Sequence, residues 1–166
     1  MLRRLTLLLI CTVLALLAAC RGYDFKVNDK VVYRPAPLFS NFDVTDPALH
    51  NCLAQAIIDG DITKATQLDS LNCSNAGIEI LAGLDQFISI TALKLSSNKI
   101  QNLSALAALT SLEVVYLDNN KIADSSALDN MINLRLLDLS GNNTLQCPAE
   151  RALGEVETLI LPAHCR

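Results

Sequence analysis

The sequence has no tryptophan, and aromatic residues of all kinds make up only 4% of its 166 positions. A hydrophobic core must therefore be built from Leu, Ile, Val and Ala. The chain also has only 5 prolines and 6 glycines, which excludes a collagen-like or proline-rich disordered protein. Positive charge is in the minority, because 13 Lys and Arg stand against 17 Asp and Glu. An acidic chain without a basic stripe is not expected to bind nucleic acid.

Aliphatic residues are abundant instead, and their distribution is uneven. Hydrophobic residues make up 51% of the chain. Arg3 and Arg4 precede an apolar run from Leu5 to Cys20 that has two threonines and no charged residue. A positively charged start followed by such a run is typical of a secretory signal peptide. A transmembrane helix is the alternative, but the run is shorter than the roughly 20 residues that cross a bilayer.

The apolar run ends in the motif Leu17-Ala18-Ala19-Cys20, which resembles the lipobox of bacterial lipoproteins. The resemblance implies that residues 1–19 are a signal peptide and that Cys20 carries the lipid, palmitate among the acyl chains. Several acyl chains hold a domain stably at a membrane, whereas one chain would not. Arg21 stands where an Asp would imply retention in the inner membrane. For a Gram-negative source, the resemblance therefore implies the outer membrane of the bacterial envelope, with the membrane face left open. A plain secreted protein is the alternative.

From Leu68 onward, the chain consists of copies of one sequence pattern. The copies follow one another at a constant spacing, which is the distance along the chain from Leu68 to Ile90. Three apolar columns keep this spacing: Leu68, Ile90, Leu112, Leu134 and Val156; Leu71, Leu93, Val115, Leu137 and Leu159; and Cys73, Leu95, Leu117, Leu139 and Leu161. A column of asparagines follows them: Asn98, Asn120 and Asn142, with Ala76 in the first copy. The alternation of apolar and polar positions predicts one short strand in each copy, with one buried face.

Each copy reads L-x-x-L-x-L-x-x-N-x-I-x-x-L-x-x-L, most clearly between Ile90 and Leu109. This pattern resembles a leucine-rich repeat of the internalin type and covers residues 68–161. The resemblance implies an α/β fold, a short solenoid with parallel strands on its concave face and 3₁₀ or irregular segments on its convex side. It also implies that Asn98, Asn120 and Asn142 form a structural ladder with neighbouring backbone groups.

A helical cap is predicted over residues 42–67, before the first repeat. Asp46 and Pro47 suit the N-cap and N1 positions of a helix, and Asp59-Gly60 suits its end. An apolar stripe at helical spacing lies between them: Leu49, Leu53, Ala56 and Ile57. The helix is expected to cover the open edge of the first strand, which would otherwise be a template for aggregation.

The segment 20–41 joins Cys20 to this cap. It contains two β-prone runs, Tyr23–Val27 and Lys30–Tyr33, on either side of the turn dipeptide Asn28-Asp29. This pattern is consistent with a small β-hairpin. A flexible tether that holds the domain away from the membrane is the alternative, and the sequence does not decide between them.

Four cysteines remain when Cys11 is assigned to the signal peptide and Cys20 to the lipid: Cys52, Cys73, Cys147 and Cys165. Four cysteines allow three pairings, and an exported compartment favours disulfides. We favour the local pairs, Cys52 with Cys73 and Cys147 with Cys165, because each would close one end of the solenoid; the second would close the C-terminal end, residues 162–166. A buried free thiol at Cys73 and a Cys/His metal site with His164 are the alternatives. No CxxC spacing supports the metal site.

A candidate partner-binding patch follows from the register of the repeats. Side chains at repeat positions 3, 5 and 7 should point out from the concave sheet. At the centre of this outward-pointing set of side chains are two aliphatic residues and a tyrosine, and three charged residues flank them: Val114, Leu136, Tyr116, Lys94, Asp118 and Asp138. Five strands at about 4.8 Å spacing make a sheet only about 20 Å wide, which suits a single segment of a protein or a peptide. Scattered apolar residues on an ordinary surface are the alternative.

Enzyme chemistry finds no support in the sequence. The two histidines, His50 and His164, lie next to no recognised nucleophile elbow, and no glycine-rich phosphate loop is present. We therefore expect a monomeric, non-catalytic protein- or peptide-binding module at the bacterial envelope, without cofactor or metal. A structural envelope lipoprotein without a dedicated ligand, and a secreted or surface adhesin or inhibitor, are the alternatives.

Overall fold

The computed structural model describes residues 25–33, 35–149, 153 and 156–165. The expected signal peptide and the expected lipidation site, Cys20, lie outside these residues. The chain divides into two compact units, Met1–Pro37 and Leu38–Arg166. In the described part of the chain, every helix is too short or too polar to cross a bilayer.

The first unit contains a β-hairpin. Strands β1 (Phe25–Val27) and β2 (Lys30–Tyr33) pair antiparallel, with an irregular register after Phe25. Asn28 and Asp29 both have left-handed backbone, with φ of 50° and 61°. Two consecutive left-handed residues make the type of two-residue turn whose twist matches that of paired strands. Residues 25–33 therefore form the hairpin that their sequence pattern predicts.

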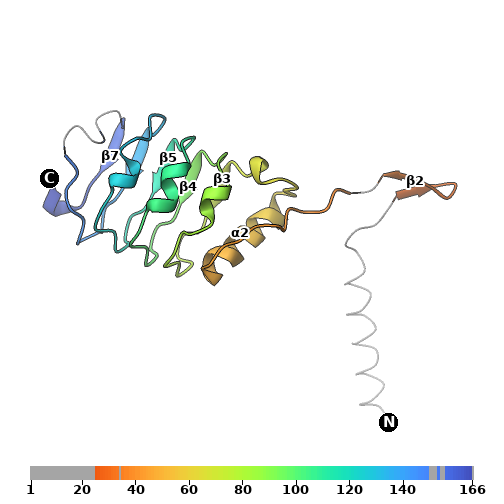
Figure 1. Ribbon diagram of the computed structural model, residues 1–166, viewed down its shortest axis with the longest axis horizontal. Helices are drawn as coiled ribbons and strands as arrows, with labels where there is room; N and C mark the ends of the chain where they lie inside the picture. The colour runs from red at the N-terminus through yellow and green to blue at the C-terminus, as the bar shows by residue number, and fades with distance from the viewer. Residues whose placement is uncertain (1–24, 34, 150–152, 154–155, 166) are drawn as a thin grey trace, which may run out of the picture. The chain divides into compact units, whose positions relative to one another are not determined.

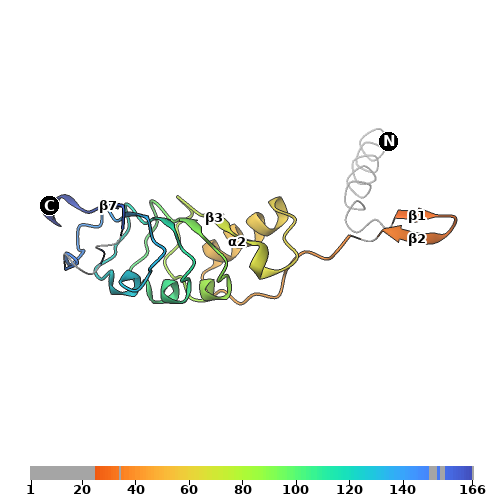
Figure 2. The same cartoon turned by 90° about the horizontal axis from the view of Figure 1, so that it is seen from above.

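The second unit is a solenoid with one five-stranded parallel sheet (Figures 1 and 2). The strands follow in chain order: β3 (Ser70–Asn72), β4 (Ala92–Lys94), β5 (Val114–Tyr116), β6 (Leu136–Asp138) and β7 (Thr158–Ile160). Each strand pairs with the next at an offset of one repeat, so that Val115, for example, lies between Leu93 and Leu137. This register confirms the predicted period and the parallel strands.

Short 3₁₀ helices form the opposite side of the solenoid. They are η3 (Leu84–Gln86), η4 (Ser104–Ala108) and η5 (Ser126–Leu128), and Figure 2 shows them in a row across from the strands. Leu84, Leu106 and Leu128 point from them into the core and are buried. The predicted 3₁₀ geometry of the return segments is confirmed.

The inward column of the sheet has one exception to its predicted burial. Leu71, Leu93, Val115 and Leu137 are at most 1% exposed, whereas Leu159 is 36% exposed. In the described part of the chain, β7 has β6 as its one neighbouring strand. A side chain inside a solenoid is covered by the repeats on both sides, whereas Leu159 has a neighbouring strand on one side. The expectation that Leu159 is buried like the rest of its column is therefore wrong.

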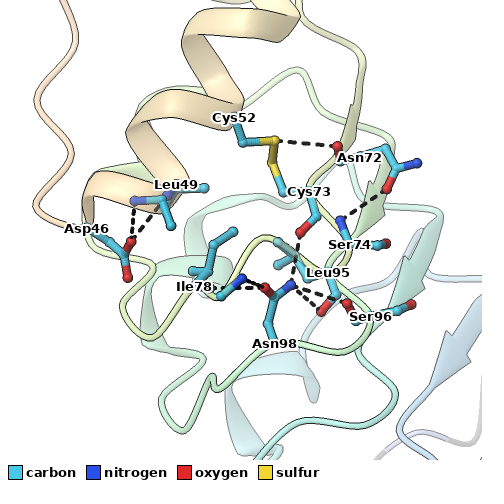
Figure 3. The surroundings of a disulfide bond; sticks show 12 residues. Asp46, Leu49, Cys52, Asn72, Cys73, Ser74, Ile78, Leu95, Ser96 and Asn98 are labelled. Carbon is cyan, nitrogen blue, oxygen red and sulfur yellow. Dashed lines mark hydrogen bonds between the residues drawn. A yellow bond between two sulfur atoms is a disulfide. The ribbon is translucent and has the colours of Figure 1, made fainter.

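The asparagine ladder joins neighbouring repeats, and Figure 3 shows its first member, Asn98. The Asn98 amide donates hydrogen bonds to the carbonyl oxygens of Cys73 and Leu95, both at 2.9 Å, and its Oδ1 accepts from the backbone of Gly77 and Ile78. Asn120 and Asn142 repeat the two amide bonds one and two repeats later, and the Oδ1 of each accepts from one backbone N–H group, that of Ile100 or Ile122. Their amides satisfy backbone groups that a buried turn would otherwise leave unpaired.

The residue before the ladder position has left-handed backbone in the first four repeats. The four residues are of different types, with φ between 54° and 74°: Asn75, Ser97, Asn119 and Gly141. Asparagine and glycine adopt this conformation at little cost, whereas serine does so at a larger one. The backbone N–H of Ser97 donates to the carbonyl oxygen of Asp118 at 2.9 Å, which ties this turn to the next repeat.

Helix α2 (Pro47–Asp59) forms the cap and lies beside β3 (Figure 1). Asp46 is its N-cap and Pro47 its first residue, and Leu49, Leu53 and Ile57 are buried as the stripe predicts. The helix ends at Gly60, but Gly60 itself is not left-handed, with φ of −94°. Gly60 is nevertheless the C-cap, as the pair Asp59-Gly60 predicts, and the left-handed residue Asp61 follows it with φ of 48°.

Asp46 also joins the cap to the first repeat. One carboxylate oxygen accepts from the backbone N–H groups of Ala48 and Leu49, and the other accepts from those of Glu79 and Ile80 at 2.8 and 2.9 Å. Burial alone would raise the pKa of this carboxyl, but the four N–H groups outweigh burial and lower the pKa below its ordinary value of 3.8. One side chain therefore caps a helix and fixes the helix to the solenoid.

An aromatic cluster completes this end of the solenoid. Phe39, Phe42 and Phe87 have ring centroids 5.9–6.0 Å apart, and Phe42 also stacks on the ring of His50 at 4.9 Å. Phe87 is fully buried. Three of the four phenylalanines of the chain are thus concentrated where the cap meets the first repeat.

Both local disulfides that we favoured are present. Cys52 of α2 is bonded to Cys73 just after β3 (Figure 3), with a Cα–Cα distance of 5.8 Å. Cys147 is bonded to Cys165, with a Cα–Cα distance of 5.3 Å. This pairing excludes a free thiol at Cys73 and places one crosslink at each end of the sheet.

Candidate functional site

The register of the sheet brings the candidate binding residues together on one face. Ala92, Val114 and Leu136 are direct partners across β4, β5 and β6, and all three are half-buried. They form an apolar row that runs across the strands. Sequence spacing alone predicted this row, because a constant offset between copies fixes which side chains become neighbours.

The next row of the face carries charge and the aromatic ring. Lys94, Tyr116 and Asp138 are direct partners across the same three strands. The Lys94 ammonium lies 5.4 Å from the centre of the Tyr116 ring, within the range of a cation–π interaction. This contact orients the ring, which is itself half-buried.

The two carboxylates of the patch are bound to neighbouring groups. The Ser96 hydroxyl donates to one oxygen of Asp118, and the Asn119 amide donates to the other at 2.7 Å. Asp138 accepts from the backbone N–H of Ser140 at 2.9 Å through one oxygen. These bonds fix the direction of each carboxylate, so that a partner would meet charges that are already in place.

We call this set of six residues the concave patch: Lys94, Val114, Tyr116, Asp118, Leu136 and Asp138. Among the residues that the structure describes, three hollows lie between successive repeats, with volumes of about 370, 380 and 470 Å³. All three are bordered by Gln101, and none includes a residue of the concave patch.

The described residues also contain one group of three side chains that offers metal-ligating atoms. The ligand atoms of Cys147, His164 and Cys165 lie within 4.8 Å of one another. Both sulfurs are joined in the disulfide, so the structure has the crosslink that we favoured over a metal site. The cluster forms because the disulfide holds Cys147 close to Cys165, and His164 is the residue next to Cys165 in the sequence. This adjacency of His164 and Cys165 is the one feature of the sequence that indicates the cluster.

Comparisons with known proteins identify the repeats. Residues 88–130 match the family model described as leucine-rich repeats (2 copies), and no curated protein matches the chain significantly. An internalin (InlF) from Listeria monocytogenes has a similar structure, with a TM-score of 0.51, 20% identity, and coverage of 69% of this chain and 42% of the internalin. Internalin C2 from the same bacterium has a TM-score of 0.42 and 19% identity, with 70% and 74% coverage.

Residues 88–130 are therefore leucine-rich repeats, and the fold of the second unit is a short solenoid with a disulfide-closed C-terminal end. The chain spans less than half the length of the internalin InlF. At 20% identity, this likeness concerns the fold.

Proposed function

We propose that the solenoid is a monomeric, non-catalytic module that binds an extended segment of a protein or peptide through the concave patch. The observation that carries this proposal is the register, which sets the apolar row of Val114 and Leu136 beside Tyr116. An apolar centre with a charged rim is the usual anatomy of a protein interface. Tyrosine is also among the residues that most often dominate binding energy.

The size of the face limits the partner. Five strands at about 4.8 Å spacing give a width of about 20 Å, which an extended chain crosses in roughly six residues. A folded protein could reach this face with one exposed strand or loop. The proposed ligand is therefore a short segment with apolar side chains for the row of Val114 and Leu136.

The binding test compares two variants of the full-length protein by crosslinking in cells and by pull-down. Tyr116→Ala combined with Leu136→Asp removes the ring and places a charge in the apolar row. We expect capture of the partner to fall by roughly tenfold or more. Ile132→Asp is the matched control, because Ile132 is 85% exposed and lies between η5 and β6, outside the strands.

Two results would overturn the binding proposal. Equal capture by the double variant and by the Ile132→Asp control would show that the partner binds elsewhere. The absence of a reproducible partner for the wild-type protein would favour a structural lipoprotein without a dedicated ligand.

We further propose that Cys20 is lipidated and that the module is anchored at the outer membrane of a bacterial envelope. The motif Leu17–Cys20 after an apolar run supports this proposal, and Arg21 supports the outer membrane. Globomycin, which blocks the lipoprotein signal peptidase, should cause the precursor to accumulate, and Cys20→Ala should lose incorporation of labelled palmitate. Unaltered processing would contradict the anchor.

The face of the membrane is a separate question, and protease shaving of intact cells answers it. Cleavage of the domain would place it outside the cell and favour an adhesin or inhibitor. Protection would place it in the periplasm, where an envelope protein would be its partner.

A further inference from the structure

The C-terminal end of the solenoid carries a cluster that the concave patch does not use. Cys147 and His164 are exposed and Cys165 is half-buried, and their ligand atoms lie within 4.8 Å of one another. Two thiolates and an imidazole are the ligand set of open zinc sites, in which water takes the fourth position. In the disulfide, however, neither sulfur is available as a thiolate.

The histidine ring is held by a contact to the backbone. Its Nε2 lies 2.9 Å from the carbonyl oxygen of Leu145. A carbonyl oxygen only accepts hydrogen bonds, so a neutral ring must carry its proton on Nε2 and leave the lone pair on Nδ1. Metal-binding histidines commonly donate their second N–H to a backbone carbonyl in this way, which fixes both the tautomer and the direction of the ring.

We propose that this end is a redox-gated site for one thiophilic divalent cation such as Zn²⁺. Oxidised, Cys147 and Cys165 close the end as a disulfide. Reduced, they bind the cation as thiolates together with Nδ1 of His164. The same two sulfurs serve both states, so the disulfide and the bound cation exclude each other.

The conversion balances in electrons and protons. A dithiol reductant supplies two electrons and two protons and becomes a disulfide itself, while the bond between Cys147 and Cys165 breaks to give two thiols. The cation then displaces one proton from each thiol, and the imidazole contributes its lone pair without releasing a proton. Return to the disulfide requires loss of the cation and an oxidant, such as an oxidised dithiol protein.

The site is accessible to selective reduction. Cys147 is exposed, whereas Cys73 of the other disulfide is 2% exposed and packs in the core. Mild treatment with a dithiol should therefore open the C-terminal bond first. Alkylation followed by mass spectrometry of peptides checks that the two new thiols are Cys147 and Cys165.

The test uses Co²⁺ as the probe, titrated anaerobically into the full chain after this reduction, with Zn²⁺ in competition. We expect one Co²⁺ per chain, the sulfur-to-cobalt charge-transfer band and its loss on addition of Zn²⁺. The oxidised protein should show no band. Saturating Zn²⁺ should also slow re-formation of the disulfide, because both reactions need the same sulfurs.

Two variants define the ligands. His164→Ala should weaken binding of Co²⁺ by at least about tenfold, and it keeps both thiols. His50→Ala is the matched control, since His50 is also exposed but lies on α2, and it should bind like the wild type. The inference is overturned if the reduced wild-type protein shows no charge-transfer band, or if His164→Ala and the wild type have equal affinities.

Discussion

The two ends of the solenoid close the same kind of sheet edge in different ways. At the N-terminal end, α2 lies beside β3, and the aromatic cluster, Asp46 and the Cys52–Cys73 bond hold it there. At the C-terminal end, β7 has one neighbouring strand in the described part of the chain, and the inward side chain Leu159 is 36% exposed. The first end is closed mainly by packing, and the second mainly by the Cys147–Cys165 bond.

This difference shows how a repeat protein distributes its stability. Interior repeats are covered by their neighbours, so each of them buries its column fully. A terminal repeat lacks one neighbour and needs another source of free energy. The cap supplies apolar burial at one end, whereas a crosslink at the other end acts chiefly on the unfolded chain. Substitutions at the two ends should therefore differ in how much stability they remove and in how far along the solenoid the loss extends.

The largest effect is expected for Phe87→Ala. Phe87 is fully buried between the cap and the first repeat, and truncation of a buried phenylalanine costs about 3–5 kcal/mol. Leu159→Ala is the counterpart at the other end and should cost less than about 1 kcal/mol, because Leu159 is already 36% exposed. Denaturant titration of both variants measures the free energy of unfolding. Equal losses would remove the distinction between the two ends.

Next in size is the paired substitution of Cys147 and Cys165 by serine. Opening a loop with a sequence separation of 18 residues should cost about 3 kcal/mol by the loop-entropy estimate. The loss should be local, with faster amide hydrogen exchange around Leu145 and unchanged exchange in α2. Faster exchange throughout the sheet would mean that the C-terminal bond stabilises the whole array.

Loss of the Asp46 carboxylate should cost about 2–3 kcal/mol in Asp46→Ala, because a helix cap is lost and the N–H groups of Glu79 and Ile80 lose their acceptor. The pKa of Asp46 is lowered in the folded protein. Its contribution is therefore complete above the ordinary value of 3.8 and is lost as the pH falls through the lower folded value. Unfolding followed from neutral to strongly acidic pH should show this loss in the wild type and not in Asp46→Ala. Parallel pH profiles would contradict the clamp.

The smallest change in stability is expected for substitutions in interior repeats, and it serves as a reference for the changes at the two ends. Ser97 has φ of 56°, at a position that carries Asn in two other repeats. Ser97→Asn should stabilise the protein by about 0.5–1 kcal/mol, because Asn adopts this conformation more readily. Gly141→Ala should act in the opposite direction, since an added Cβ would overlap Oδ1 of Asn119. Thermal unfolding measures both shifts.

Much of the fold follows from the sequence because the repeat is strict. A constant period predicts the register, the ladder of Asn98 and its equivalents, and the apolar row of the concave patch. Local sequence likewise predicts α2, because Asp46 and Pro47 by themselves indicate where a helix begins. These features depend on neighbours in sequence or on a fixed offset between copies.

The remaining features depend on contacts that no local pattern encodes. The N-cap signal of Asp46 accounts for one carboxylate oxygen, and the partners of the other lie 33 and 34 residues further on. The exposure of Leu159 depends on what packs beyond its strand, which membership of a column does not reveal. In the concave patch, the contact between Lys94 and Tyr116 depends on side-chain rotamers, which the period of the repeat leaves free.

The double attachment of Asp46 also bears on the order in which the chain folds. A stacked array can nucleate at any repeat and propagate to its neighbours. Here the cap and the first repeat share one carboxylate, one aromatic cluster and one crosslink, so this end can form contacts before further repeats are added. Nucleation there would send a folding front from β3 towards β7, with the Cys147–Cys165 bond as the last tertiary element to form.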